Sequence, residues 1–113
     1  MTHKEIEKFL FSLGGVWLDY PFGEETAVYK YGEKPEGKIV AIVAEGSKPL
    51  RVSLKCDPQL AETLRERYET VIPGYHLNKK HWNTIVVDGR LSGKQVKEMI
   101  DDSYGLVAPK KKK

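Results

Sequence analysis

The sequence predicts an α+β fold in which a mainly antiparallel sheet is covered by helices on one face. Three segments repeat apolar residues with the period of a helix, and several others are rich in β-branched and aromatic residues. The links between the strand-like segments are too short for parallel crossovers. We therefore expect a single domain over residues 1–109, with the element order α-β-β-β-β-α-β-β-α.

The three helices are predicted by their first turns. Thr2 and Glu5 have the spacing of a capping box, and residues 92–95 (Ser-Gly-Lys-Gln) repeat that spacing before the last helix. Asp57 is a favourable N-cap for the middle helix, with Pro58 at its first helical position. The apolar stripes predicted for the three helices are Ile6, Phe9, Leu10 and Leu13; Leu60, Ala61, Leu64 and Tyr68; and Val96, Met99 and Ile100.

The strands are predicted from their alternation. Residues 38–44 are apolar on both alternating faces, which is typical of a central strand. Residues 50–55 alternate cleanly, so Arg51, Ser53 and Lys55 should form a basic outer face. The complete set of predicted strands is 16–20, 26–31, 38–44, 50–55, a short one around 70–76, and 82–87.

Positive charge is concentrated in two blocks of the chain. The formal net charge is +3, but Lys110–Lys113 supply four positive charges, so residues 1–109 have a net charge of −1. Residues 71–97 hold five Lys or Arg and one acid, and residues 32–55 hold five against three acids. Clustered cations can bind a polyanion even when the total charge is near zero. The alternative is an ordinary solvated face.

Several protein classes are disfavoured. No apolar run approaches the length of a membrane span, and the N-terminal segment has no signal-peptide pattern, so we expect a cytoplasmic protein with no membrane role. A lone cysteine, Cys56, excludes an internal disulfide and a CxxC metal site. Residues 110–113 should form a basic, disordered tail.

Signals for catalysis are weak, and we expect neither an enzyme nor a cofactor. The sequence contains no glycine-rich phosphate loop and no HExxH motif. His76 and His81 lie near Asp88, but a metal site would need further ligands, and histidines bonded to the backbone are the favoured interpretation. Cys56 could be activated by the helix that follows it, although a buried, inert thiol is favoured.

The segment YHLNKKHWNTIVVDG (75–89) combines aromatic and basic side chains. Tyr75 and Trp82 could stack on nucleobases or close the end of the core. The core is favoured for Trp82 because Ile85 and Val87 follow it. Residues 79–81 (Lys-Lys-His) precede the strand in a loop and should face solvent or a partner.

The chain resembles the MmcQ/YjbR family. LKCDPQLAETLRERY, VIPGYHLNKKHWNTIVVDG and MIDDSYGLV carry the resemblance, which extends over about Leu13 to Val107. It implies a fold similar to type III secretion chaperones, and a DNA-binding role by analogy with the paired hairpins ("double wing") of a phage transcription factor. The loop YGEKPEGK is longer than the tight turn expected in the family. The family motif falls on Pro73, Gly74, Tyr75, His76, Asn78, Lys79, His81, Trp82, Asn83 and Thr84.

Three functions are consistent with these observations. The first is binding of double-stranded DNA through phosphate contacts, and the second is a protein-interaction module with no nucleic-acid role, in either case as a monomer or weak dimer. The third is a small-molecule or catalytic role around His76, Asn78, His81 and Asp88. The residues expected to contact DNA are Lys34, Lys38, Lys48, Arg51, Lys55, Lys79, Lys80 and His81.

Overall fold

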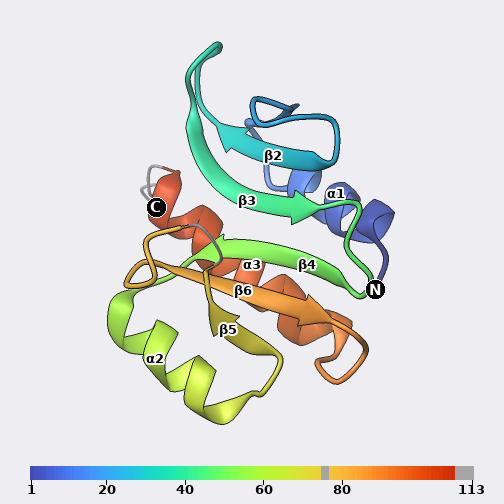
Figure 1. Ribbon diagram of the computed structural model, residues 1–113. Helices are drawn as coiled ribbons and strands as arrows, with labels where there is room; N and C mark the ends of the chain where they lie inside the picture. The colour runs from blue at the N-terminus through green and yellow to red at the C-terminus, as the bar shows by residue number, and fades with distance from the viewer. Residues whose placement is uncertain (75–76, 109–113) are drawn as a thin grey trace.

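The computed structural model describes residues 1–74 and 77–108 and has the predicted order of elements (Figure 1). Its strands form one antiparallel sheet in the order β1-β2-β3-β4-β6-β5, so β3 is an interior strand as predicted. The α+β prediction is confirmed. The elements are α1 (His3–Ser12), β1 (Val16–Asp19), β2 (Thr26–Tyr31), β3 (Lys38–Ala44), β4 (Leu50–Lys55), α2 (Pro58–Arg67), β5 (Val71–Pro73), β6 (Trp82–Val87) and α3 (Gly93–Val107).

The predicted helix starts are confirmed. Thr2 and Glu5 form a reciprocal capping box, in which the Thr2 backbone N–H donates to Glu5 Oε1 over 2.8 Å. Ser92 and the third residue of α3 do the same at the start of that helix. Asp57 caps α2 by accepting a hydrogen bond from the Leu60 backbone N–H at 3.4 Å. These bonds satisfy N–H groups that have no partner within the helix.

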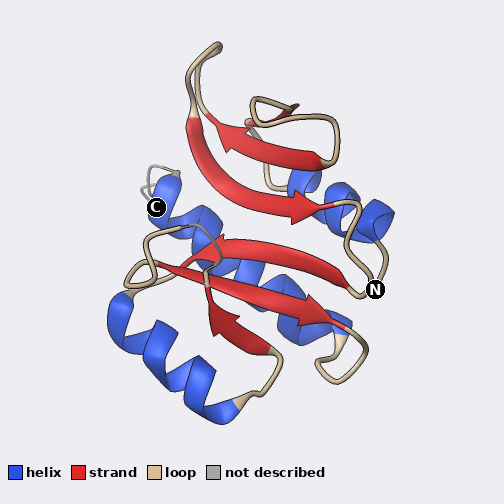
Figure 2. Cartoon of the chain, viewed as in Figure 1, coloured by secondary structure: helices blue, strands red, loops and turns tan. Residues whose placement is uncertain are grey.

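One face of the sheet carries the core. Figure 2 shows α1 and α3 behind the sheet, and α2 beside β5 and β6. Strand register places Ala27, Val43, Val52, Ile85 and Val71 in one row across five strands, and every member of that row is buried. This row packs with the buried apolar residues of α1 and α3, which are Ile6, Leu10, Val96, Ile100 and Val107.

The middle helix differs from its predicted stripe at one position. Ala61 is fully buried, whereas Leu60 is 38% exposed and is not part of the core. Neighbouring helical residues are about 100° apart around the axis. The stripe formed by Ala61, Leu64 and Tyr68 therefore leaves Leu60 at its border, facing partly into solvent.

A bulge bends β3 near its start. The pairing with β2 shifts register between Tyr29 and Lys30, so that Val40 has no opposite residue. The fully buried hydroxyl of Ser103 in α3 donates to the Val40 carbonyl over 2.6 Å and accepts from the Lys55 backbone N–H at 3.0 Å. β3 curves strongly in Figure 1, as expected for a strand with a bulge. Ser103 thus supplies hydrogen bonds that the irregular ladder leaves unmade.

Candidate functional site

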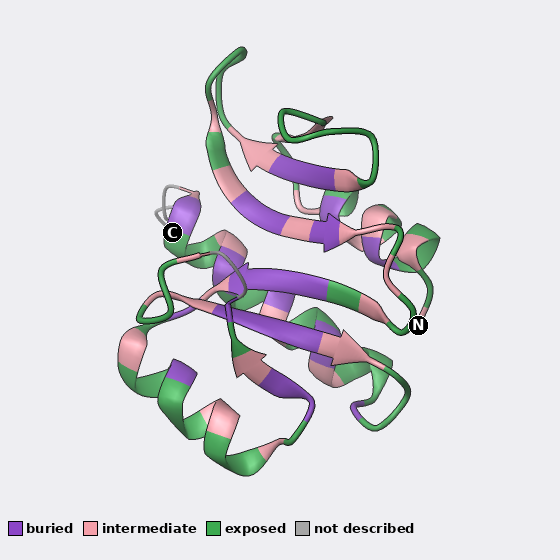
Figure 3. Cartoon of the chain, viewed as in Figure 1, coloured by how far each residue is buried: buried purple, intermediate pink, exposed green. Residues whose placement is uncertain are grey.

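The second face of the sheet has no described helix on it and carries two of the residues expected to contact DNA, Arg51 and Lys55. In β4, Val52 and Leu54 point into the core, so Arg51, Ser53 and Lys55 lie on the helix-free face, as predicted. Arg51 is exposed and Lys55 is partly exposed. However, Ser53 is only 9% exposed. The outer face is therefore not a flat, fully solvated surface, as Figure 3 also indicates by the buried stretches along β4 and β6.

Lys55 marks one end of this face and lies opposite Trp82 of β6. The prediction that Trp82 belongs to the core is wrong. Successive residues of a strand alternate between faces, so Trp82 cannot share the face of Ile85 and Val87. Asn83 instead points towards the helices, and Trp82 is partly exposed on the helix-free face.

The loop between β5 and β6 holds Lys79 and Lys80 at the same end of the sheet as Lys55. Lys79 and Lys80 are exposed, and His81 is partly exposed. The His81 carbonyl accepts a hydrogen bond of 2.7 Å from the Cys56 backbone N–H, the residue that follows Lys55. The structure therefore brings these predicted cations together around the ends of β4 and β6.

Motif residues shape this loop through hydrogen bonds. Asn78 Oδ1 accepts from the Lys80 backbone N–H at 2.9 Å, and the Asn78 carbonyl accepts from the His81 N–H at 3.1 Å. The Gly74 N–H donates to the Trp82 carbonyl over 3.0 Å, and a Cβ at position 74 would lie 2.8 Å from Trp82 Cβ. These motif residues act as structural residues of the loop. Tyr75 and His76 lie outside the described residues.

Arg65 of α2 holds the loop from the helix side, a role that no sequence pattern indicated. Its Nη1 donates to the Lys79 carbonyl over 3.1 Å and to Asn83 Oδ1 over 2.8 Å. Asn83 is 3% exposed, and its Nδ2 donates to the Ala61 carbonyl over 3.3 Å. No local spacing links Arg65 to a loop fourteen residues away, so only the tertiary structure reveals this contact.

The remaining predicted cations occupy two other places. Lys48 is exposed in the β3–β4 hairpin, at the Arg51 end of β4. Lys34 and Lys38 belong to the β2–β3 hairpin, where Lys34 Nζ lies 5.3 Å from the centre of the Trp17 ring. Arg51 and Lys55 are four positions apart in β4, or about 13 Å along the strand. The eight residues therefore form three groups rather than one continuous patch.

The predicted cations are not neutralised within the described part of the chain. There, ion pairs within 4.0 Å join Lys30 to Asp19, Arg90 to Asp88 and His3 to Glu45, and none involves a residue expected to contact DNA. The Lys30 ammonium, through its hydrogen bond, holds the pKa of Asp19 below its usual value. The eight side chains expected to contact DNA therefore take no part in the ion pairs of the described residues.

The geometry argues against a catalytic site around His81 and Asp88. These residues flank the two ends of β6, and Asp88 accepts hydrogen bonds of 2.6 and 2.9 Å from Arg90. Among the described residues, no group of three or more His, Cys, Asp or Glu side chains could hold a metal ion. Cys56 is buried as predicted, and burial raises the pKa of its thiol.

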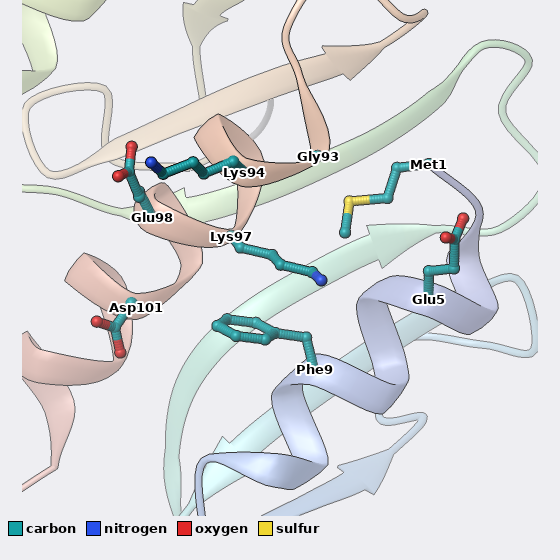
Figure 4. A pocket seen from close by; sticks show the side chains of 8 residues that line it. All are labelled: Met1, Glu5, Phe9, Gly93, Lys94, Lys97, Glu98 and Asp101. Carbon is teal, nitrogen blue, oxygen red and sulfur yellow. The ribbon is translucent and has the colours of Figure 1, made fainter.

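A hollow between α1 and α3, on the helix-covered side, is lined by none of the residues expected to contact DNA (Figure 4). Its volume is about 600 Å³, and Lys97 Nζ lies 5.6 Å from the centre of the Phe9 ring. Lys94 and Lys97 share it with three acids, so its charges largely compensate one another. No described helix is long and apolar enough to cross a membrane.

Comparison with known proteins identifies relatives over most of the chain. A family model described as YjbR matches residues 11–106. The Escherichia coli O157:H7 protein YbdF is 34% identical over 105 residues, which cover 93% of this chain and 83% of the relative. Bacillus subtilis YyaQ is 34% identical over 116 residues, covering 94% of this chain and 98% of the relative. Escherichia coli K12 YjbR is 44% identical over 71 residues, covering 63% and 60%.

Solved structures have the same fold. The crystal structure of a Deinococcus radiodurans protein with the domain DUF419 has a TM-score of 0.90 and 36% identity, covering 94% of this chain and 78% of that chain. A Pseudomonas syringae crystal structure has a TM-score of 0.79 and 26% identity, covering 96% and 100%. The names of the sequence relatives describe them as uncharacterized proteins.

Proposed function

The chain belongs to the YjbR family, and we propose that it binds the phosphate backbone of double-stranded DNA without catalysing a reaction. The observation that supports this most strongly is the group formed by Lys55, Lys79, Lys80 and His81 at one end of β4 and β6. We call this group the basic end. Its members come from two separate segments and have no described acid within 4.0 Å.

The basic end is suited to phosphate because its loop is held in place before any partner binds. The turn at 78–81 is closed by two hydrogen bonds that Asn78 accepts from the Lys80 and His81 N–H groups, and Arg65 donates to the Lys79 carbonyl from the helix side. Lys79 and Lys80 project from this turn into solvent. A preorganised loop loses less conformational entropy on binding, so more of the electrostatic attraction contributes to affinity.

The long β2–β3 hairpin supplies a second, more distant contact in this proposal. Lys34 lies over the Trp17 ring at 5.3 Å, and Lys30 lies over the same ring at 5.4 Å. Lys30 is engaged by Asp19, whereas Lys34 is exposed and has no described acid within 4.0 Å. Lys34, together with the exposed Lys38 of the same hairpin, would therefore reach a phosphate, and Arg51 with Lys48 would make a third contact.

Fluorescence anisotropy with a labelled duplex of random sequence tests the proposal. The protein is titrated at several salt concentrations, in its full-length form and with residues 110–113 removed, because a bare tetralysine can bind DNA by itself. If about 4–6 phosphates are contacted, log K should fall against log salt with a slope of about −4 to −5. The truncated protein must retain saturable binding at low salt. A flat baseline for the truncated protein would refute DNA binding by the folded part.

A further inference from the structure

A groove on the helix-free face lies beside the basic end but has a different chemical character. Strand register aligns Thr26, Ala44 and Arg51 in one row, with a second row alongside it. Phe22 from the β1–β2 loop and Leu77 from the β5–β6 loop also line the groove, which has a volume of about 470 Å³. Ligand sites typically fall between about 300 and 1,000 Å³. The second row of lining residues consists of Ile42, Ser53 and Thr84.

The groove exists because small side chains lie on its floor and larger ones lie around it. Ser53 and Thr84 are almost fully buried, and their hydroxyls are 2.8 Å apart, within hydrogen-bonding distance. The floor of the groove therefore contains two hydroxyl groups, but these hydroxyls are hydrogen-bonded to each other. Phe22, in contrast, is 65% exposed. Phe22 and Ile42 both line the groove and give it apolar surface that a ligand could remove from water.

Arg51 is the one charged side chain among the described residues that line the groove. It is exposed, and no described carboxylate lies within 4.0 Å of it. A guanidinium is a planar fork of donors that matches the two oxygens of a carboxylate. Among the described residues, the groove thus combines an apolar surface with a single cationic group and no compensating acid.

We propose that this groove binds a small amphipathic carboxylate, with its apolar body along Ile42 and Ala44 and its carboxylate on Arg51. Phe22 and Leu77 would enclose the body from the two loops. The charge complementarity and the limited volume favour such a ligand over a protein segment, because a standard protein interface is far larger than this groove. The proposal shares only Arg51 with the proposed DNA contacts, and the basic end takes no part in it.

The test is a titration of uniformly ¹⁵N-labelled protein with octanoate, followed by amide chemical shifts. Three related compounds separate the contribution of the apolar body from that of the carboxylate charge. Octanol has the apolar body without the charge, and acetate has the charge without the apolar body. Octylammonium has the same apolar body with a positive charge. We expect saturable octanoate binding with Kd of about 1 mM or tighter, and weaker binding of all three controls by about tenfold or more. The shifts should be centred on Ile42, Ala44, Arg51 and Thr84.

Arg51→Gln provides the matched variant, with Lys94→Gln on α3 as its control. Arg51→Gln should weaken octanoate binding about tenfold and leave octanol binding unchanged, while Lys94→Gln should change neither. Equal affinities for octanoate and octanol in the unaltered protein would overturn the proposal, as would shifts centred on the α1–α3 hollow. Retained octanoate affinity in a folded Arg51→Gln protein would also overturn it.

Discussion

Arg65 in α2 donates a 2.8 Å hydrogen bond to the side-chain oxygen of Asn83, a buried residue of β6. The same guanidinium nitrogen bonds the Lys79 carbonyl at 3.1 Å, so one side chain joins a helix, a strand and the loop of the basic end. Asn83 completes the arrangement through its bond to the Ala61 carbonyl. The motif residue Asn83 therefore supports the loop without reaching its surface.

Replacing Asn83 with alanine should reduce the free energy of unfolding by about 2 kcal/mol, because the buried bonds to Arg65 and Ala61 are lost together. Urea denaturation measures this change. Hydrogen exchange should also be faster at the Cys56 N–H, which donates to the His81 carbonyl of the loop. Glu66→Gln, at an exposed position of α2, is the control and should change the free energy of unfolding by less than about 0.5 kcal/mol. An unaltered stability of Asn83→Ala would show that this network contributes nothing.

Ser103→Ala should destabilise the protein through a different part of the sheet. The hydroxyl of Ser103 is the partner of both the Val40 carbonyl and the Lys55 N–H, and it is fully buried. Its removal leaves two backbone groups unsatisfied, so we expect a loss of about 2 kcal/mol or more in the free energy of unfolding. Asp101→Asn serves as the control, because Asp101 is an exposed residue of α3, the helix that contains Ser103. A loss no larger than that of the control would mean that water replaces the hydroxyl.

The features that could be predicted from the sequence are those that follow from local patterns, namely the starts of the helices and the faces of the strands. The capping pairs predicted the starts of α1 and α3, and alternation in residues 50–55 predicted which side chains of β4 face the helices. The same rule of alternation, applied to Trp82, would have placed it outside the core. The role of Arg65 in holding the loop and the position of Phe22 in the groove could not be predicted. Both follow from the packing of segments that are distant in sequence, which no periodicity encodes. The grouping of Lys55 with Lys79 likewise depends on strand order.

Cys56 should react slowly with thiol reagents in the folded protein. Burial, assisted by the nearby carboxylates of Asp102 and Asp57, raises the pKa of the thiol, so less of the reactive thiolate is present at neutral pH. The reaction with iodoacetamide should therefore be slower than in the urea-unfolded protein, and mass spectrometry can follow it. Since the folded-state pKa is raised, the stability gained from keeping the thiol protonated is present at neutral pH and decreases as pH rises through that pKa.

Asp102→Asn separates the two causes of the low reactivity. It removes one negative charge and leaves the burial of Cys56 in place, so the reaction should become only modestly faster. Unfolding should accelerate it much more, because burial is the larger cause. Equal rates for the folded and unfolded protein would contradict the inert role assigned to this cysteine.

The paired substitution Lys79→Gln/Lys80→Gln should weaken DNA binding if the basic end contacts phosphates. Each lost phosphate contact reduces the magnitude of the salt slope by about 1, so the pair should reduce it by about 2. The loss should be similar for duplexes of different sequence, because phosphate contacts do not distinguish base pairs. Lys4→Gln/Lys8→Gln makes the same change in net charge on α1, at exposed positions on the helix-covered side. Anisotropy titrations of both variants, each lacking residues 110–113, should therefore differ. If the two pairs lower affinity and slope equally, net charge alone explains binding, and the basic end has no special part in it.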